Sequence, residues 1–225
     1  MANGKDNAGK LRIDSAIGLN EFFSDRSGKD ELVSVKRNEG GFVHLIDVIN
    51  PDEKERNTFE CDMVITSVIH VEADEEKKTP EKAIIKGAIF DFRNALLPVE
   101  FTALNPNAIA YFEDLGVSQS NPTFTKLWGR QISEMIIRKI EEESAFGESK
   151  VREVKNTHKD FVITGASPNP YEWDDESTLT VAELNEAITA RETYLATKKQ
   201  QDDAYKASKN APANAITPTP GQFNF

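Results

Sequence analysis

The chain has 225 residues, a formal net charge of −11 at pH 7, and 38% hydrophobic against 29% charged residues. This length suits one substantial domain with appendages, or two small domains, and the low hydrophobic fraction indicates that part of the chain lies outside a packed core. The sequence contains neither the roughly 20 consecutive apolar residues of a membrane span nor the apolar stretch of a secretory signal, so we expect a cytoplasmic protein that does not enter a membrane.

The first fifty residues predict a flexible arm followed by a hairpin. Residues 1–29 begin polar and glycine-rich, and within them residues 17–25 suit a short amphipathic helix or a turn. Residues 31–50 predict a β-hairpin, because apolar runs flank the sequence Asn-Glu-Gly-Gly at 38–41. We expect this hairpin to open the folded domain.

The next strand is predicted from strict alternation of apolar and polar residues over 58–72. A change of phase near Ser67 predicts a β-bulge or a strong bend within it. The apolar residues that alternate before this point are Phe59, Cys61, Met63 and Ile65.

Residues 83–93 and 97–103 predict two further strands. Because side chains alternate between the faces of a strand, the first of them is expected to place Phe90 and Phe92 on the same face as Lys86 and to place Arg93 on the opposite face. We therefore expect two adjacent exposed rings beside Lys86, with Arg93 at the rim.

The second half of the chain predicts two helices, two long strands and a tail. Asn105-Pro106 is a typical helix start and predicts a helix over 106–114. Thr180 and Glu183 form a capping box, which predicts a helix from Thr180 to about Ser208. Residues 123–133 predict a strand, and residues 134–148 fit either a helix face or a strand, of which we favour one long strand that bends. Residues 150–166 predict its hairpin partner, and a proline-rich tail of 209–225 follows the second helix.

These elements predict a mainly β fold with α additions. About five strands, with a short helix between the third and fourth, match the order of the oligonucleotide/oligosaccharide-binding (OB) barrel, whose second and third strands carry the usual binding face. The expected organisation is a flexible arm at 1–29, an OB-like nucleic-acid-binding domain at 30–172, an acidic segment and helix at 173–208, and a disordered tail at 209–225 ending in phenylalanine.

Catalytic and metal-binding signatures are not apparent. The sequence has no nucleophile elbow, no P-loop and no dinucleotide-binding glycine motif. The single Cys61 and three distant histidines do not have the spacing of a zinc site, and the acidic runs resemble solvated loops. We expect no enzyme activity, no cofactor and no metal.

Basic and aromatic residues alternate on one face of the strand that begins at residue 123. Rings that stack on bases, together with cations beside the backbone, are how proteins hold single-stranded nucleic acid. The parity of barrel strands favours core positions for Phe101 and Phe124 and leaves Trp128 undecided. The candidate nucleic-acid-binding residues are Lys86, Phe90, Phe92, Arg93, Lys126, Trp128, Arg130, Arg138 and Lys139.

Residues 83–172 resemble single-stranded DNA-binding proteins of tailed phages. The runs "FTKLWG" and "EESAFGE" are the most distinctive parts of this resemblance. It implies an OB-type barrel that acts in phage DNA replication or recombination inside an infected bacterial host, with a mobile C-terminal segment that recruits replication or recombination proteins.

The C-terminal tail matches this pattern only in part. Many such proteins end in an acidic tail with a terminal phenylalanine, whereas this sequence ends "GQFNF" without a nearby Asp or Glu. We expect Phe223 and Phe225 to dock on a partner, because apolar rings on a solvated tail are typical of docking segments. Self-association into a homo-oligomer remains open from the sequence.

The sequence is compatible with two main functions and, as a third possibility, with a structural phage or scaffold protein. The first is non-sequence-specific binding of single-stranded DNA by stacked rings and basic contacts. The second is an acidic DNA mimic or inhibitor that binds a basic host protein, for which the net charge of −11 is the reason. The segment 123–163, with 8 basic and 7 acidic residues, favours the first.

Overall fold

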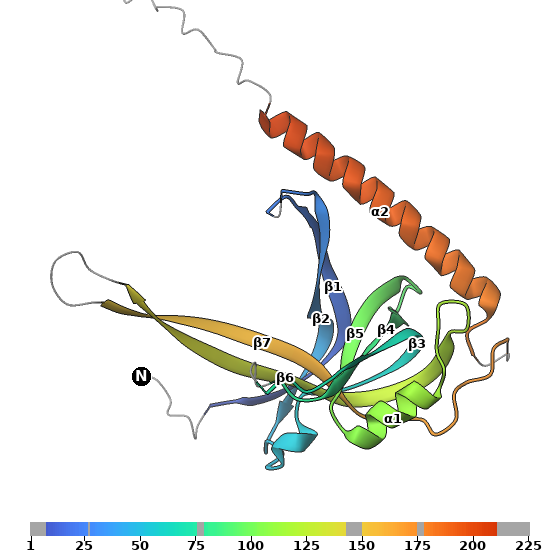
Figure 1. Ribbon diagram of the computed structural model, residues 1–225, viewed down its shortest axis with the longest axis horizontal. Helices are drawn as coiled ribbons and strands as arrows, with labels where there is room; N and C mark the ends of the chain where they lie inside the picture. Colours follow the sequence, from blue (N-terminus) through green and yellow to red (C-terminus); the bar gives the residue numbers. More distant parts are fainter. Residues whose placement is uncertain (1–7, 27, 76–78, 143–149, 175–177, 211–225) are drawn as a thin grey trace, which may run out of the picture.

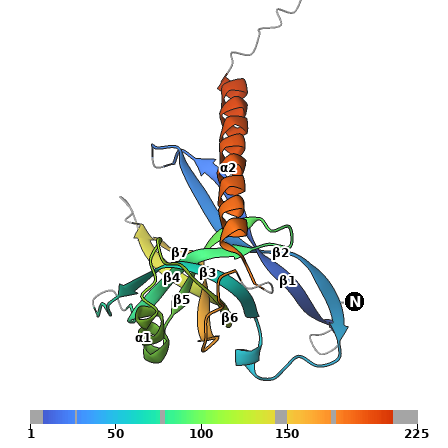
Figure 2. The ribbon, with the colours of Figure 1, turned by 90° about the vertical axis from the view of Figure 1, so that its right-hand side faces the viewer.

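The computed structural model shows a small β-barrel from which a hairpin, a two-stranded arm and a long helix project in different directions (Figures 1 and 2). Among the residues it describes, no helix has the length and apolar character that crossing a membrane requires. The described residues are 8–26, 28–75, 79–142, 150–174 and 178–210.

Five strands close the barrel in the order β3-β4-β5-β7-β6. Strands β3, β4 and β5 form an antiparallel meander, and β5 pairs in parallel with β7 only through Thr102 and Ala103. Helix α1 (Pro106–Asp114) lies between β5 and β6, so the order and the helix position are those of an OB barrel, as predicted. The strands are β3 (Thr58–Val71), β4 (Lys82–Phe90), β5 (Leu96–Ala103), β6 (Thr123–Glu142) and β7 (Lys150–Ala166).

Strand β3 contains the predicted bulge. The register between β3 and β4 shifts between Ile65 and Ser67. Before the shift, alternate side chains from Phe59 to Ile65 point into the barrel, where Met63 and Ile65 are fully buried. The extra residue bends the strand, which lets one strand pair with both β4 and β6 in a small closed barrel.

Aromatic side chains fill the middle of the barrel. The ring centroid of Phe101 lies 4.9 Å from that of Phe59 and 5.9 Å from that of Phe161. Helix α1 covers one end of this core with Ile109 and Phe112, both buried. The core position predicted for Phe101 is therefore confirmed.

Both predicted helix starts are confirmed by their capping geometry. The Asn105 side chain accepts a hydrogen bond from the backbone N–H of Asn107 at 2.9 Å, and Pro106 occupies the first turn of α1. Helix α2 (Val181–Asn210) begins with the capping box: Thr180 N–H donates to Glu183 at 2.9 Å, and Glu183 N–H donates to the Thr180 hydroxyl at 3.2 Å.

The N-terminal region differs from the sequence prediction. Residues expected to form a flexible arm with a short helix or turn instead form β1 (Lys10–Ser24), and the hairpin predicted over 31–50 is wrong because β2 (Glu31–Ile46) is one continuous strand. β1 and β2 pair with each other as a two-stranded sheet outside the barrel. The barrel itself therefore occupies 58–166, and a short 3-10 turn, η2 (Glu53–Glu55), precedes it.

The two glycines at the centre of β2, which suggested a hairpin turn in the sequence, form a β-bulge instead. Gly40 and Gly41 have φ values of 62° and 125°, and the register with β1 shifts at this point, between Asp14 and Ala16. A positive φ is typical of a turn, but it is also typical of a bulge. Because β1 supplies a partner on both sides of the glycines, the chain makes a bulge and continues.

The β1–β2 hairpin is anchored on the barrel near its middle. Ile17 and Leu19 pack against the barrel core, and Lys36 of β2 donates to the backbone carbonyl of Glu100. The Lys36 amino group lies 5.1 Å from the ring centroid of Phe161, and burial lowers its pKa although Asp160 and Glu100 oppose this shift. The hairpin therefore covers the barrel where the pairing of β5 with β7 is short.

A second apolar cluster lies on the outside of the barrel. Ala88, Val64 and Phe124 stand side by side on β4, β3 and β6, because Val64 is the register partner of both others. Tyr171, Trp173 and the first turns of α2 cover this row. Phe124 is therefore buried, but under the C-terminal segment and not inside the barrel.

Strands β6 and β7 extend beyond the barrel as a long arm (Figure 1). Their pairing continues from the barrel out to Glu142 and Lys150. Strand β6 therefore confirms the favoured reading of residues 123–148 as one long strand as far as Glu142, the residues after it lying outside the described part, and β7 confirms the partner strand over 150–166. The arm lies in the position of the loop between the fourth and fifth strands, which is one of the loops that bind oligonucleotides in OB folds.

Candidate nucleic-acid interface

The outer face of β4 is less open than its sequence suggests. Lys86 forms an ion pair with Glu100 on the neighbouring strand at 2.8 Å. Phe90 is half-buried and packs against the second apolar cluster, near Leu184 of α2. The C-terminal segment thus covers part of the face formed by the second and third barrel strands, where OB folds usually bind.

Phe92 and Arg93 do not continue β4, which ends at Phe90. The chain turns through Asn94, whose φ is 59°, and the Asp91 carboxylate accepts the backbone N–H groups of Arg93 and Ala95 at 2.8 Å each. The prediction that Phe90 and Phe92 share a strand face is therefore wrong.

The turn brings Phe92 and Arg93 together. The Phe92 ring is 84% exposed, and the Arg93 guanidinium lies 5.0 Å from its centroid. A cation over an aromatic face is attracted by the ring quadrupole. Arg93 is therefore a neighbour of an exposed ring and not a contact on the far side of a strand.

Strand β6 places Lys126 and Arg130 on the outside of the barrel, as predicted, and it places Trp128, whose position the sequence left undecided, on the same side. Lys126, Trp128 and Arg130 alternate with Leu127 and Gly129, which face inward and are buried. The Trp128 side chain remains 41% exposed.

A hollow of about 590 Å³ lies beside Trp128. It is bounded by the start of β3, by β6 and by Thr164 of β7, and two of its lining residues, Lys54 and Arg130, are basic. Glu60, on the same rim, forms an ion pair with Lys126, and this carboxylate raises the pKa of Lys126. The hollow therefore combines one exposed indole with two cations whose charges Glu60 does not directly compensate.

Gly165 of β7 makes room for the Trp128 ring. The two residues are partners in the β6–β7 register, and a Cβ atom at position 165 would overlap the indole. Nothing in the local sequence pattern pointed to Lys54, Thr164 or Gly165. Their contribution depends on strand pairing across the barrel.

We expect Gly165→Ala to displace the Trp128 indole from its packing position over residue 165 without unfolding the barrel, because the ring is partly exposed and free to rotate outward. The emission of Trp128, measured in a Trp173→Phe background, should shift to the wavelength of a solvated indole. An unchanged spectrum would contradict this packing. Gly9→Ala is the control, because a Cβ there meets only the Leu45 side chain, at an ordinary contact distance of 3.9 Å.

Comparison with protein families gives one match. The model of a family described as YorF matches residues 1–201, which is most of the chain. The chain belongs to the YorF family. This family is phage-associated, which agrees with the resemblance to phage proteins at that coarser level. No curated protein and no solved structure gives a significant match.

Some candidate residues of this YorF chain lie outside the described part of the structure. The backbone of Arg138 and Lys139 belongs to the β6–β7 arm, but their side chains are outside the description. The tail residues Phe223 and Phe225 also lie outside it.

One group of carboxylates in the YorF chain comes close enough to suggest a metal site. Oxygens of Asp30, Asp202 and Asp203 lie within 4.8 Å of one another. Lys199 and Lys206 form ion pairs with this group at the contact between α2 and the hairpin turn. These amino groups already pair with the carboxylates, so ion pairing between α2 and the β1–β2 turn accounts for the cluster.

Proposed function

We propose that this protein binds single-stranded DNA without sequence preference and acts in phage DNA replication or recombination within the infected bacterial host. The observation that supports this most is the exposed Trp128 ring beside a hollow flanked by Lys54 and Arg130 on an OB-like barrel. The proposed contact surface lies mainly on β6 and the start of β3, because the C-terminal segment covers part of the β4–β5 face.

The chemistry of this surface suits an unpaired strand. An indole stacks on any base, since every base has a π-face, and such stacking requires a base that is not inside a duplex. The cations at Lys54 and Arg130 would contact the phosphates on either side. Phe92 with Arg93 offers a second ring and cation at the β4–β5 turn.

The β6–β7 arm is proposed to contribute to the same DNA-binding surface. Lys155 and Lys159 are exposed on β7, and the arm occupies the place of an OB loop that contacts oligonucleotides. The net charge of −11 opposes long-range attraction of DNA, so binding should depend on these local cations and weaken strongly with salt.

Trp128→Ala should lower the affinity for a single-stranded oligonucleotide of about 30 residues, because one stacked base contributes roughly 1–3 kcal/mol. Fluorescence anisotropy at low salt measures this loss. The matched control is Tyr205→Ala, which removes an exposed ring from α2, far from the barrel face. Arg130→Gln should in addition reduce the slope of affinity against salt by about 0.7.

The outcomes separate the proposal from its alternative. Equal affinity of the wild type and Trp128→Ala for the oligonucleotide would remove β6 from the interface. No binding to the oligonucleotide at low salt would end the proposal. The same result together with capture of a basic host protein would favour an acidic DNA mimic.

A further inference from the structure

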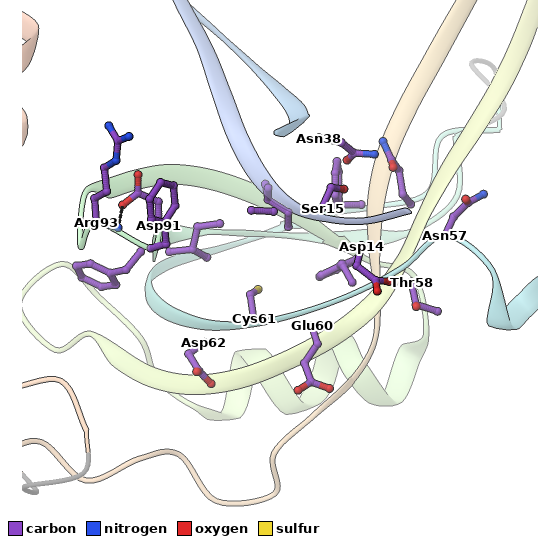
Figure 3. A pocket seen from close by; sticks show the side chains of 18 of the residues that line it. Asp14, Ser15, Asn38, Asn57, Thr58, Glu60, Cys61, Asp62, Asp91 and Arg93 are labelled. Carbon is purple, nitrogen blue, oxygen red and sulfur yellow. Dashed lines mark hydrogen bonds between the residues drawn. The ribbon is translucent and has the colours of Figure 1, made fainter. Parts of the chain in front are cut away.

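A large groove lies between the β1–β2 hairpin and the side of the barrel formed by the start of β3 (Figure 3). Its volume is about 1820 Å³, and it is lined by β1 from Leu11 to Ile17, by β3 from Thr58 to Asp62, and by the turn after β4. It adjoins the Trp128 hollow at the start of β3, yet its chemistry is different.

The groove contains an unpaired strand edge. β4 pairs with β3 only from Met63 onward, so within the described chain residues Thr58–Asp62 pair with β6 alone. Because successive residues of a strand point their N–H and C=O groups to opposite edges, alternate residues of this segment, Thr58, Glu60 and Asp62, offer their backbone groups on the side where β4 would continue. A free edge of this kind accepts an added strand through main-chain hydrogen bonds.

The two faces of this edge differ in polarity. On the inner side Phe59 and Cys61 face the groove together with Ile89, and Leu11 and Ile13 stand opposite them on β1 with 55% and 62% of their surface exposed. Phe59 and Ile89 are packed in the barrel core, so the uncovered part of this apolar face is formed by Leu11 and Ile13, with the partly exposed Cys61 beside them.

On the outer side of the edge the side chains are acidic. Glu60 and Asp62 point away from Cys61, as Figure 3 shows. Lys126 pairs with Glu60, but the partner of Asp62 is the neutral Tyr171 hydroxyl at 2.8 Å, which leaves the Asp62 charge in place.

The whole groove is acidic. Eight carboxylates line it against three guanidinium groups, and no lysine is among its described lining residues. One of these arginines, Arg12, is bound to Asp14 at 2.7 Å. Burial, with Asp62 and Glu60 adding to it, raises the pKa of the Cys61 thiol to about 12. Away from its margin at the β4–β5 turn, where Phe92 and Arg93 belong to the proposed nucleic-acid surface, this environment repels a phosphate backbone.

We propose that the groove binds an extended, basic segment of a partner protein, which adds as a strand to the Thr58–Asp62 edge. Side chains of an added strand alternate between the two faces. Every second residue would therefore be apolar, against Cys61 and Ile13, and the residues between would be Lys or Arg, against Asp62 and its neighbours. The sequence after residue 210 fits poorly, because Pro212, Pro218 and Pro220 lack the N–H that a ladder needs.

Peptide probes test both features of this occupant. A labelled peptide of about ten residues, alternating Lys and Val, should bind the full-length protein at least about tenfold more tightly than its Glu–Val counterpart. Replacing alternate Val residues by Pro should abolish binding. Amide hydrogen exchange should slow at Thr58, Glu60 and Asp62 when the Lys–Val peptide is present, because the N–H groups of these alternate residues become hydrogen-bonded.

A variant of the groove wall gives the control within the protein. Ile13→Lys places a cation in the groove and should lower the affinity for the Lys–Val peptide by about tenfold or more. Val48→Lys adds the same charge at an exposed apolar residue outside the groove and should leave peptide binding unchanged.

Each outcome decides the proposal independently of DNA binding. Equal affinity for the Lys–Val and Glu–Val peptides, or binding without slower exchange at Thr58–Asp62, would overturn it. If Ile13→Lys instead strengthened oligonucleotide binding, as an added cation does beside phosphates, the groove would belong to the nucleic-acid path and the proposal would fail. Retained oligonucleotide binding by Ile13→Lys with loss of the peptide supports a separate partner site.

Discussion

Replacing Arg191 by methionine is expected to destabilise the docking of α2 on the hairpin by about 3–5 kcal/mol, because it leaves a buried carboxylate without its partner. Arg191 donates to Glu21 of β1 through both terminal nitrogens, at 2.9 Å for Nη1. The side chains are 11% and 4% exposed. Chemical denaturation and amide exchange along α2 measure this loss.

Two controls separate the buried charge from simple loss of contact. The double variant Glu21→Leu, Arg191→Met should recover most of the stability, since removing both members of a buried pair is close to neutral. Lys206→Met breaks an exposed ion pair with Asp30 at the same interface and should change stability little. An equal loss of stability in Arg191→Met and Lys206→Met would contradict the expectation that the buried pair contributes more than the exposed one.

Phe101→Ala should cost about 3–5 kcal/mol of the free energy of unfolding, because it opens a cavity in the middle of the barrel. The Phe101 ring is fully buried and contacts the rings of Phe59 and Phe161. The centre of the ring also lies 5.6 Å from the Lys36 amino group, so the packing of the β1–β2 hairpin on the barrel should weaken as well. Thermal or urea unfolding measures the effect.

Phe92→Ala is the matched comparison, since both residues belong to the run "GAIFDFRNALLPVEF". Phe92 is 84% exposed, so its removal should change stability by less than about 0.5 kcal/mol. Its effect should appear in oligonucleotide affinity instead. A large loss of stability in Phe92→Ala would show that this ring packs in solution.

The strands and helices that depend on local signals were predictable. The capping residues Asn105 and Thr180 lie immediately before the helices that they begin. The alternation of apolar residues from Phe59 to Ile65 directly indicates a strand with one face toward the core. Sequence reasoning also placed Lys126 and Arg130 on one outward face, because unpaired charges are seldom buried, whereas the exposure of Trp128 was decided only by the structure. The proposed role of these residues in binding remains a prediction.

Other features depend on contacts far apart in the sequence. Gly40 and Gly41 suit a turn and a bulge equally, and only pairing with β1 decided for the bulge. β1 itself carries alternate apolar residues, Ile17 and Leu19 among them, that could have indicated a strand, but glycines and polar residues weaken the pattern.

By itself, the sequence determined the OB-like order of strands and helix, since alternation and capping act within a few residues. The tertiary structure alone decided which outward faces are open. Phe90 and Phe124 are covered because Trp173 and Leu184 pack on them from the C-terminal segment, whereas Trp128 stays exposed over Gly165. An outward-facing ring looks the same in sequence whether solvent or a distant segment covers it, because burial depends on what the rest of the chain brings to that face.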